Sequence, residues 1–227
     1  MANKINLAGY IDHTLLSPIA TADQIDELCH EAIQYRFHSV CVHTRWISQA
    51  ADILHNSGVK VCSVVSFPNG SDSTKIKAAQ ATEAVFSGAD EIDMVADLSA
   101  IVTGDSKYLT SQINAVLRVC RSMKNAAILK VIIESASLDL NQKIFAAKLV
   151  EHCGADFIKT STGLHQAGGA TVEDIHLIRD IAPKCKIKAA GGIKTAASAI
   201  AMINAGADRI GTSSAVDIIK QYEQADG

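Results

Sequence analysis

The sequence predicts an α/β protein that folds as a closed (β/α)8 barrel, in which eight parallel strands alternate with helices. One observation behind this is a repeat at residues 88–90, 154–156 and 206–208, where Gly-Ala-Asp ends a helical stretch and a β-branched apolar run follows. Glycine there suits the left-handed conformation that closes a helix. The other is that the strand segments are too apolar to be half-solvated, which is typical of a parallel sheet covered by helices.

Eight apolar segments occur along the chain, separated by stretches of helical periodicity. They cover residues 10–14, 39–43, 60–67, 91–95, 127–134, 157–161, 185–190 and 209–212. Two helices have recognisable starts, at Thr21, which forms a capping-box pattern with Gln24, and at Thr171. An open doubly wound sheet is the alternative, but the glycine-rich fingerprint expected after its first strand is absent. No linker divides the chain, so we expect one TIM-barrel domain over residues 1–227.

The composition argues against several classes of partner. The formal net charge is −3 and aromatic residues are few, so no nucleic-acid partner is expected. No apolar run approaches the ~18 residues of a membrane span, so we expect no membrane partner and a cytoplasmic location. The six cysteines lack a C-x-x-C pair and are expected to be reduced. The eight histidines lack metal-ligand spacing, so no metal is expected.

Strand parity places several charges inside the barrel. Alternate residues of a barrel strand face the lumen and the helices. With the apolar neighbours facing the helices, the inward positions hold Asp12, Asp93, Lys130, Glu134, Lys159, Lys186 and Lys188. Any one of these could be a satisfied ion pair or a lysine that reaches solvent, but a purely structural barrel would place Val, Ile or Leu there. A cluster shared by several strands therefore predicts an active site.

Two lysines that share a lumen have a chemical consequence. Each disfavours the charged form of the other and burial adds to this, so at least one amine of the Lys159 and Lys188 pair is expected to be neutral near pH 7. A neutral amine attacks carbonyl groups. The sequence thus favours imine chemistry, with a carboxylate available to move protons.

Two glycine-rich and hydroxyl-rich segments suggest a phosphate site. Residues 188–195 follow the seventh strand and contain Gly191 and Gly192, and residues 211–214 follow the eighth. Either one alone could be a tight turn. Together they lie where barrels commonly bind phosphate through backbone N–H groups and a helix N-terminus.

These motifs resemble the deoxyribose-phosphate aldolase family. The resemblance runs through residues 11–16, 66–70, 88–95, 129–134, 157–163 and 188–195. It implies a class I aldolase that reversibly cleaves 2-deoxy-D-ribose 5-phosphate to D-glyceraldehyde 3-phosphate and acetaldehyde. It also implies that no cofactor is needed, that the partners are a phosphorylated sugar and aldehydes, and that the chain forms a homodimer.

The resemblance assigns roles by motif. Lys159 would form the Schiff base, Lys188 would keep it nucleophilic, and Asp93 would relay protons, with Asp12 and Lys130 assisting that network. Cys41 would line the aldehyde end of the pocket, and residues 191–192 and 213–214 would hold the phosphate. The expected substrate-binding residues are Cys41, Thr160, Thr162, Gly163, Gly191, Gly192, Gly211, Ser213 and Ser214.

The chain departs from some family members at two places. Leu164 stands where they carry a lysine, and Tyr222 is followed by five residues where they end in a tyrosine. Two other functions stay open: another lysine-dependent barrel such as a transaldolase, which shares the imine chemistry, and a non-catalytic phosphosugar-binding barrel that keeps only the phosphate site.

Overall fold

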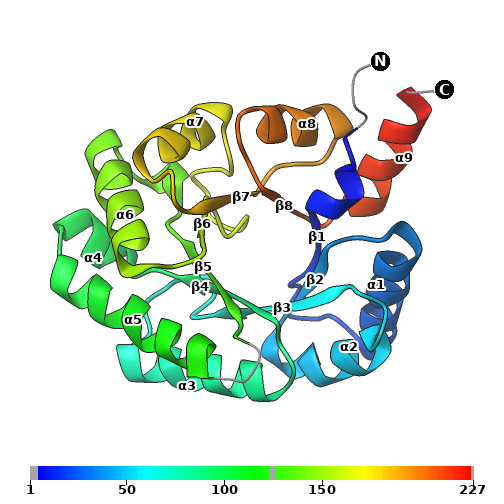
Figure 1. Cartoon of the computed structure of the whole chain (residues 1–227), viewed down its shortest axis with the longest axis horizontal. Helices are drawn as coiled ribbons and strands as arrows, with labels where there is room; N and C mark the ends of the chain where they lie inside the picture. The colour runs from blue at the N-terminus through cyan, green and yellow to red at the C-terminus, as the bar shows by residue number, and fades with distance from the viewer. Residues whose placement is uncertain (1–4, 123–125, 226–227) are drawn as a thin grey trace.

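A computed structural model describes residues 5–122 and 126–225 of the chain. The described residues form a closed barrel in which the strands follow one another in sequence order and every neighbouring pair is parallel (Figure 1). The strands are β1 Ile11–Leu15, β2 Ser39–Val42, β3 Lys60–Val65, β4 Glu91–Val95, β5 Ile128–Ile132, β6 Phe157–Lys159, β7 Lys186–Ala190 and β8 Arg209–Thr212. The predicted (β/α)8 barrel is confirmed.

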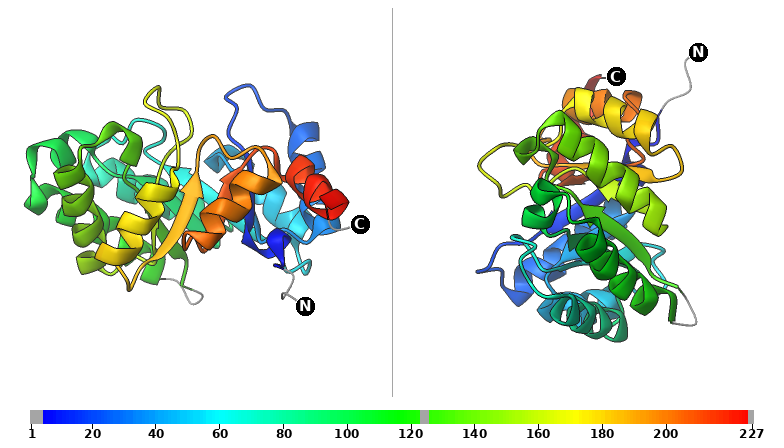
Figure 2. Two further views of the ribbon diagram at one scale, coloured as in Figure 1. Left: turned by 90° about the horizontal axis from the view of Figure 1, so that it is seen from above. Right: turned by 90° about the vertical axis from the view of Figure 1, so that its left-hand side faces the viewer.

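Helices surround the sheet on its outer side, as two further views show (Figure 2). They are α1 Ala22–Tyr35, α2 Ile47–Leu54, α3 Thr74–Phe86, α4 Leu98–Thr103, α5 Ser106–Ser122, α6 Leu140–Cys153, α7 Val172–Ile181, α8 Ala196–Asn204 and α9 Ala215–Ala225. Short 3-10 turns occur at Leu7–Tyr10, Thr44–Trp46 and Ser135–Ser137. In the described part of the chain, no helix combines the length and the apolar character that a membrane crossing requires.

The helix caps and glycine turns that the sequence predicts occur at the expected residues. Thr21 and Gln24 form the capping box of α1, and the Thr171 side chain accepts the first-turn N–H of Asp174 at the start of α7. The glycines of the three Gly-Ala-Asp repeats all have positive φ, between 79° and 112°. Each repeat therefore turns the chain from a helix into the following strand.

Strands β2, β3, β5 and β6 end earlier than predicted, and for β3 and β5 the reason is a turn in the backbone. Ser66 and Glu134 have φ values of 55° and 52°, in the left-handed region, and these stop β3 and β5 before residues 67 and 134. Strand β6 ends at Lys159, before the predicted residue 161. The connection after β4 also holds two helices, because Gly104 adopts a left-handed conformation that ends α4.

Apolar side chains fill the space between the sheet and the helices. Ile92, Met94, Leu129, Ile158 and Ile187 are fully buried there. In a parallel pair, residues in register point to the same side of the sheet. Because the helix-facing positions are apolar, the register leaves the polar positions of neighbouring strands together in the lumen.

Candidate active site

Asp93 is the centre of the polar lumen. Its Oδ1 accepts a hydrogen bond from Lys130 Nζ at 2.8 Å, and its Oδ2 accepts one each from Lys159 Nζ and Lys188 Nζ, both at 2.8 Å. The register explains the meeting, because Asp93 pairs with Lys130 on the next strand and Lys159 pairs with Lys188. All four residues are buried. Strand parity therefore predicted the direction of these side chains correctly.

Further ion pairs extend this network toward the amino ends of the strands. Lys188 Nζ lies 2.5 Å from Asp12 Oδ2, and Asp12 Oδ1 accepts a hydrogen bond from Arg209 at 2.9 Å. Lys130 Nζ lies 2.5 Å from Glu91 Oε2, and Arg209 also lies near Glu91, at 3.4 Å. We call Asp93, Lys159 and Lys188 the upper cluster and Glu91 with Arg209 the lower cluster. Lys130 and Asp12 connect them.

The ion pairs fix the charge of most of these groups. Burial alone would raise the pKa of Asp93, but the three ammonium groups around it outweigh burial and hold that pKa well below its usual range. Burial would likewise lower the pKa of Lys188, yet attraction to Asp12 and Asp93 raises it. The pKa of Lys130 is raised in the same way, mainly by Asp93.

The sequence predicts that at least one amine of the Lys159 and Lys188 pair is neutral, and Lys188 is not that one. The charge of each amine depends on the carboxylates that it contacts as well as on the other lysine. In the structure, Lys188 contacts two carboxylates and remains a cation. Lys159 contacts one carboxylate, that of Asp93, among the ion pairs of the described residues.

A cavity of about 380 Å3 opens above the upper cluster. Of the three lysines bound to Asp93, Lys159 is the one that lines this cavity. Six expected substrate-binding residues line it too: Thr162, Gly163, Gly191, Gly192, Gly211 and Ser213. The remaining wall comes from the loops after β1, β3, β6 and β7 and includes Leu16, Phe67, Leu164 and Lys194.

Gly191 is required by close packing of the loops that form the cavity wall. Its φ is 86°, and a Cβ at this position would come within 2.9 Å of the Gly169 Cα and 3.2 Å of the Gly163 Cα. Both contacts are with backbone, which cannot move aside as a flexible side chain would. The loops after β6 and β7 therefore approach each other only with glycine at residue 191.

Three expected substrate-binding residues do not line the cavity. Thr160 is buried and exchanges hydrogen bonds with the Ala190 backbone, so it joins β6 to β7. Ser214 donates its backbone N–H to Thr212 Oγ1. Cys41 packs in a small buried cluster beneath Leu16 and Phe67, so a layer of side chains separates it from the cavity.

Two inward positions predicted by parity differ in the structure. Lys186 is exposed, because it is the first residue of β7 and extends past the end of the barrel, where its Nζ lies 5.7 Å from the Phe157 ring centre. Glu134 is buried, but it follows β5 and accepts the Thr162 N–H through both carboxylate oxygens, at 3.1 and 3.3 Å. It supports the loop of the cavity wall instead of joining the lysines.

At the chain end, Tyr222 donates to the Ile5 carbonyl, away from the cavity.

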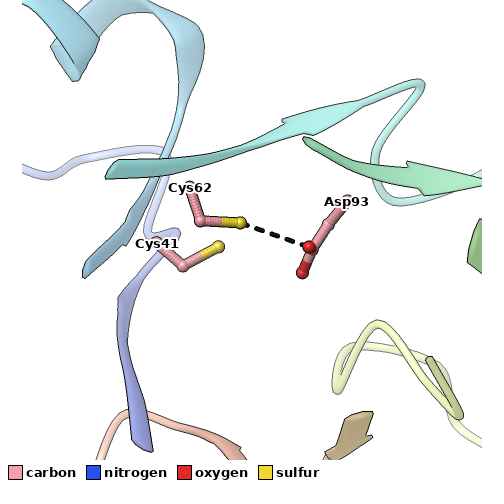
Figure 3. Close-up of side chains that lie close together, drawn as sticks. All are labelled: Cys41, Cys62 and Asp93. Carbon is pink, nitrogen blue, oxygen red and sulfur yellow. Dashed lines mark hydrogen bonds between the residues drawn. The ribbon is translucent and has the colours of Figure 1, made fainter. Parts of the chain in front are cut away.

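Sequence reasoning missed Glu91, Arg209 and Cys62. The first two share the inward parity of Asp93 and Gly211 on their strands, so the same rule applied to the first residue of each strand would have found them. Cys62 pairs in register with Cys41 and donates to Asp93 Oδ1 at 3.2 Å (Figure 3). An uncharged side chain inside a strand carries no comparable signal.

Cys41, Cys62 and Asp93 also form a group whose ligand atoms lie within 4.8 Å of one another. As a donor set for a metal ion it fits poorly. Both oxygens of Asp93 already accept hydrogen bonds from ammonium groups, and Lys130 Nζ lies 3.3 Å from Cys62 Sγ. A divalent cation would have to enter among three positive charges. The two thiols are better understood as hydrogen-bonding groups.

Known proteins resemble this chain along nearly its whole length. Residues 7–221 match the model of the family described as DeoC/LacD family aldolase. The chain belongs to this aldolase family. It is 45% identical over 216 residues to a deoxyribose-phosphate aldolase of Brevibacillus brevis, covering 95% of this chain and 96% of that one. It is 46% identical over 225 residues to the corresponding protein of Thermococcus gammatolerans, covering 98% and 99%.

Solved aldolase structures superpose closely on this DeoC/LacD family barrel. A deoxyribose phosphate aldolase from Aeropyrum pernix, described as a tetramer, has a TM-score of 0.89 at 31% identity, with 96% of this chain and 92% of that chain covered. An aldolase named QR15 has a TM-score of 0.91 at 35% identity, with 98% of each chain covered.

Proposed function

We propose that the chain is a class I deoxyribose-phosphate aldolase that forms its Schiff base on Lys159. The reaction would be reversible cleavage of 2-deoxy-D-ribose 5-phosphate to D-glyceraldehyde 3-phosphate and acetaldehyde. One observation carries the assignment of the lysine: Lys159 both contacts Asp93 and lines the cavity. The substrate follows from the names of the relatives, which match over nearly the whole chain.

The charge balance of the lumen supports Lys159 as the nucleophile. Four cationic side chains, those of Lys130, Lys159, Lys188 and Arg209, face the three carboxylates of Asp12, Glu91 and Asp93. Releasing one proton would balance these charges. Lys159 has the fewest carboxylate contacts of the three lysines and the only direct access to the cavity among them, so it is the amine best placed to attack a carbonyl group.

The steps then follow from imine chemistry. The Lys159 amine would attack the aldehyde carbon of the open-chain sugar, and water would leave to give a protonated imine. That imine would accept the electron pair when the carbon–carbon bond to the hydroxyl-bearing carbon breaks, while the hydroxyl proton passes to a base. Asp93, hydrogen-bonded to both lysines, would relay this proton, and Asp12 and Lys130 would hold the charges around it. Protonation and hydrolysis would then release acetaldehyde.

The phosphate would lie against the part of the cavity wall formed by the carboxyl ends of β7 and β8 and the loops that follow them. Gly191, Gly192, Gly211 and Ser213 line the wall there, and their backbone N–H groups and the serine hydroxyl are suitable donors for an anion. Lys194 lines the same cavity and would supply the positive charge that Leu164 lacks.

The decisive experiment is a cleavage assay that measures both products from 2-deoxy-D-ribose 5-phosphate. The wild type should release both products, and Lys159→Ala should lose activity by at least ~10^4-fold. Lys186→Ala is the matched control, because Lys186 is exposed at the opposite end of the barrel, and it should retain activity. Cleavage of a transaldolase substrate in preference would favour the other lysine-dependent barrel. Sugar phosphate binding with no turnover would favour the non-catalytic barrel.

We further propose that residues 1–227 form one catalytic domain that works in the cytoplasm as a homodimer. Alignment with relatives along nearly their full length supports the single domain. The dimer rests on the family resemblance, while the Aeropyrum pernix relative is described as a tetramer. Light scattering of the purified protein distinguishes the two assemblies by mass.

A further inference from the structure

Two cysteines lie side by side under the floor of the cavity. Cys41 on β2 and Cys62 on β3 are register partners, and their sulfur atoms lie within 4.8 Å of each other (Figure 3). Neighbouring strands are spaced by about 4.8 Å, which falls inside the Cα separation of ~4.4–6.8 Å that a disulfide tolerates. The two side chains emerge on the same face of the sheet, so they need no change of direction to meet.

The surroundings of the two thiols differ in a way that suits oxidation. The neighbouring Cys62 side chain lowers the pKa of Cys41, against the opposing effect of burial and with help from the charge of Lys188. Burial raises the pKa of Cys62, whose Sγ donates to Asp93 Oδ1 at 3.2 Å. Thiolate character is what makes a cysteine react with peroxide.

A route for a small oxidant also exists. The two cysteines form a separate buried cluster with Val64, apart from the main core, and Leu16 and Phe67 pack on it. Both of these covering side chains line the cavity and are themselves only half-buried. A molecule of the size of hydrogen peroxide therefore has one layer of side chains to pass.

We propose that Cys41 and Cys62 form a site of reversible oxidation, at which hydrogen peroxide converts the two thiols into a disulfide that lowers the activity of the enzyme. In the first step the Cys41 sulfur attacks one peroxide oxygen, the O–O bond breaks, and a sulfenic acid and water form. The Cys62 sulfur then attacks the Cys41 sulfur, and its proton leaves with the hydroxyl group as a second water. Two thiols are oxidised and one peroxide is reduced to two waters.

The disulfide would act through Asp93. Oxidation removes the S–H donor that Cys62 directs at Asp93 Oδ1, and turns the sulfur that Lys130 Nζ contacts at 3.3 Å toward Cys41. Loss of a hydrogen bond to a charged group is equivalent to about a tenfold effect on an equilibrium or a rate. The effect on turnover rests on the proposed function, whereas formation of the disulfide does not.

The test treats the full-length, reduced protein with a few equivalents of hydrogen peroxide and blocks the remaining thiols with N-ethylmaleimide. The intact mass should fall by about 2 Da before blocking. After trypsin, the disulfide should join residues 37–45 to residues 61–75, which are separate peptides because cleavage follows Arg36, Arg45, Lys60 and Lys75. Cleavage activity should fall about tenfold and return with dithiothreitol.

Two variants sharpen the result. Cys62→Ser keeps a hydroxyl donor for Asp93 but has no second sulfur, so peroxide should leave it without the 2 Da loss and without a reversible fall in activity. Cys153→Ala removes the one free cysteine that is not buried among the described residues, and it should respond to peroxide as the wild type does. The proposal would be wrong if maleimide labels both Cys41 and Cys62 after full peroxide treatment, or if the disulfide involves another cysteine. It would also be wrong if peroxide no longer lowers the activity of Cys153→Ala. The mass measurements stand even if the cleavage assay fails.

Discussion

The two halves of the barrel lumen are both charged, but they differ in access. In the lower cluster, Glu91 and Arg209 contact each other and are held by Lys130 and Asp12 within the closed barrel. In the upper cluster, Lys159 contacts one carboxylate and lines the cavity. Burial of charge is common to both. What distinguishes a candidate catalytic group is an ionisable side chain that is incompletely paired and can meet a ligand.

The comparison gives the two clusters different expected roles. In the lower cluster, Glu91 contacts His38, whose Nε2 lies 3.2 Å away, and also contacts Lys130. This cluster should serve mainly to hold the lumen charges in place. The upper one should serve the chemistry. Substitutions that remove one carboxylate from each cluster separate these roles.

The largest effect is expected for Asp93→Asn. The amide keeps the size of the side chain but removes the charge that three ammonium groups share, and it cannot relay a proton as a carboxylate does. We expect turnover to fall by about 10^3-fold, measured in the cleavage assay, with an additional loss of folding stability. Near wild-type turnover in Asp93→Asn would remove the functional difference between the clusters.

Glu91→Gln is the corresponding change in the lower cluster, and we expect it to cost stability more than turnover. Breaking a buried ion pair costs about 3–5 kcal/mol in the free energy of unfolding, because the partner charge is left unpaired. The pKa of Glu91 is lowered, since Lys130 and Arg209 outweigh the opposing effect of burial. The Glu91 carboxylate therefore stabilises the fold above the unfolded-state value of ~4.3 and loses that contribution as the pH falls below it.

Urea unfolding of Glu91→Gln at several pH values checks this. The stability difference between wild type and variant should be largest at pH 7 and shrink below about pH 4. A difference that stays constant down to acid pH would show that the ionised carboxylate is not what stabilises the fold.

A smaller effect is expected for Lys188→Leu. Lys188 is a fixed cation between Asp12 and Asp93, and a nearby positive charge favours the neutral form of a neighbouring amine. We expect turnover to fall by about 10^2-fold and the rising limb of the pH–rate profile to move to higher pH. Turnover and a pH profile that both match the wild type would assign Lys188 to the structural group with Glu91.

Much of the fold could be predicted from the sequence because its signals are local. Glycine at the Gly-Ala-Asp junctions, capping residues such as Thr21 and the parity of the strands each act within a few residues. Parity also predicted that Lys159, Lys188 and Asp93 would face one lumen. The strand ends at Ser66 and Glu134 were missed because either residue can also continue a strand.

The features that could not be predicted depend on contacts between distant segments. Lys77 on α3 is fully buried and donates to the Val95 carbonyl and to Gln112, and burial lowers its pKa to about 8. Nothing near it in the sequence indicates those acceptors. Which of the two lysines stays charged could not be predicted from the lysine pair alone for the same reason, because the carboxylates that contact Lys188 come from β1 and β4.

The central claim is that Lys159, and neither of the other two lysines bound to Asp93, forms the imine. Incubation with acetaldehyde followed by borohydride reduction should convert one lysine to an ethyl derivative, adding about 28 Da. Trypsin normally cleaves after Lys159 and gives peptides 149–159 and 160–179, so an adduct at Lys159 should instead give one peptide of residues 149–179 with that added mass. An ethyl group on Lys130 or Lys188, with cleavage after Lys159 intact, would contradict the claim.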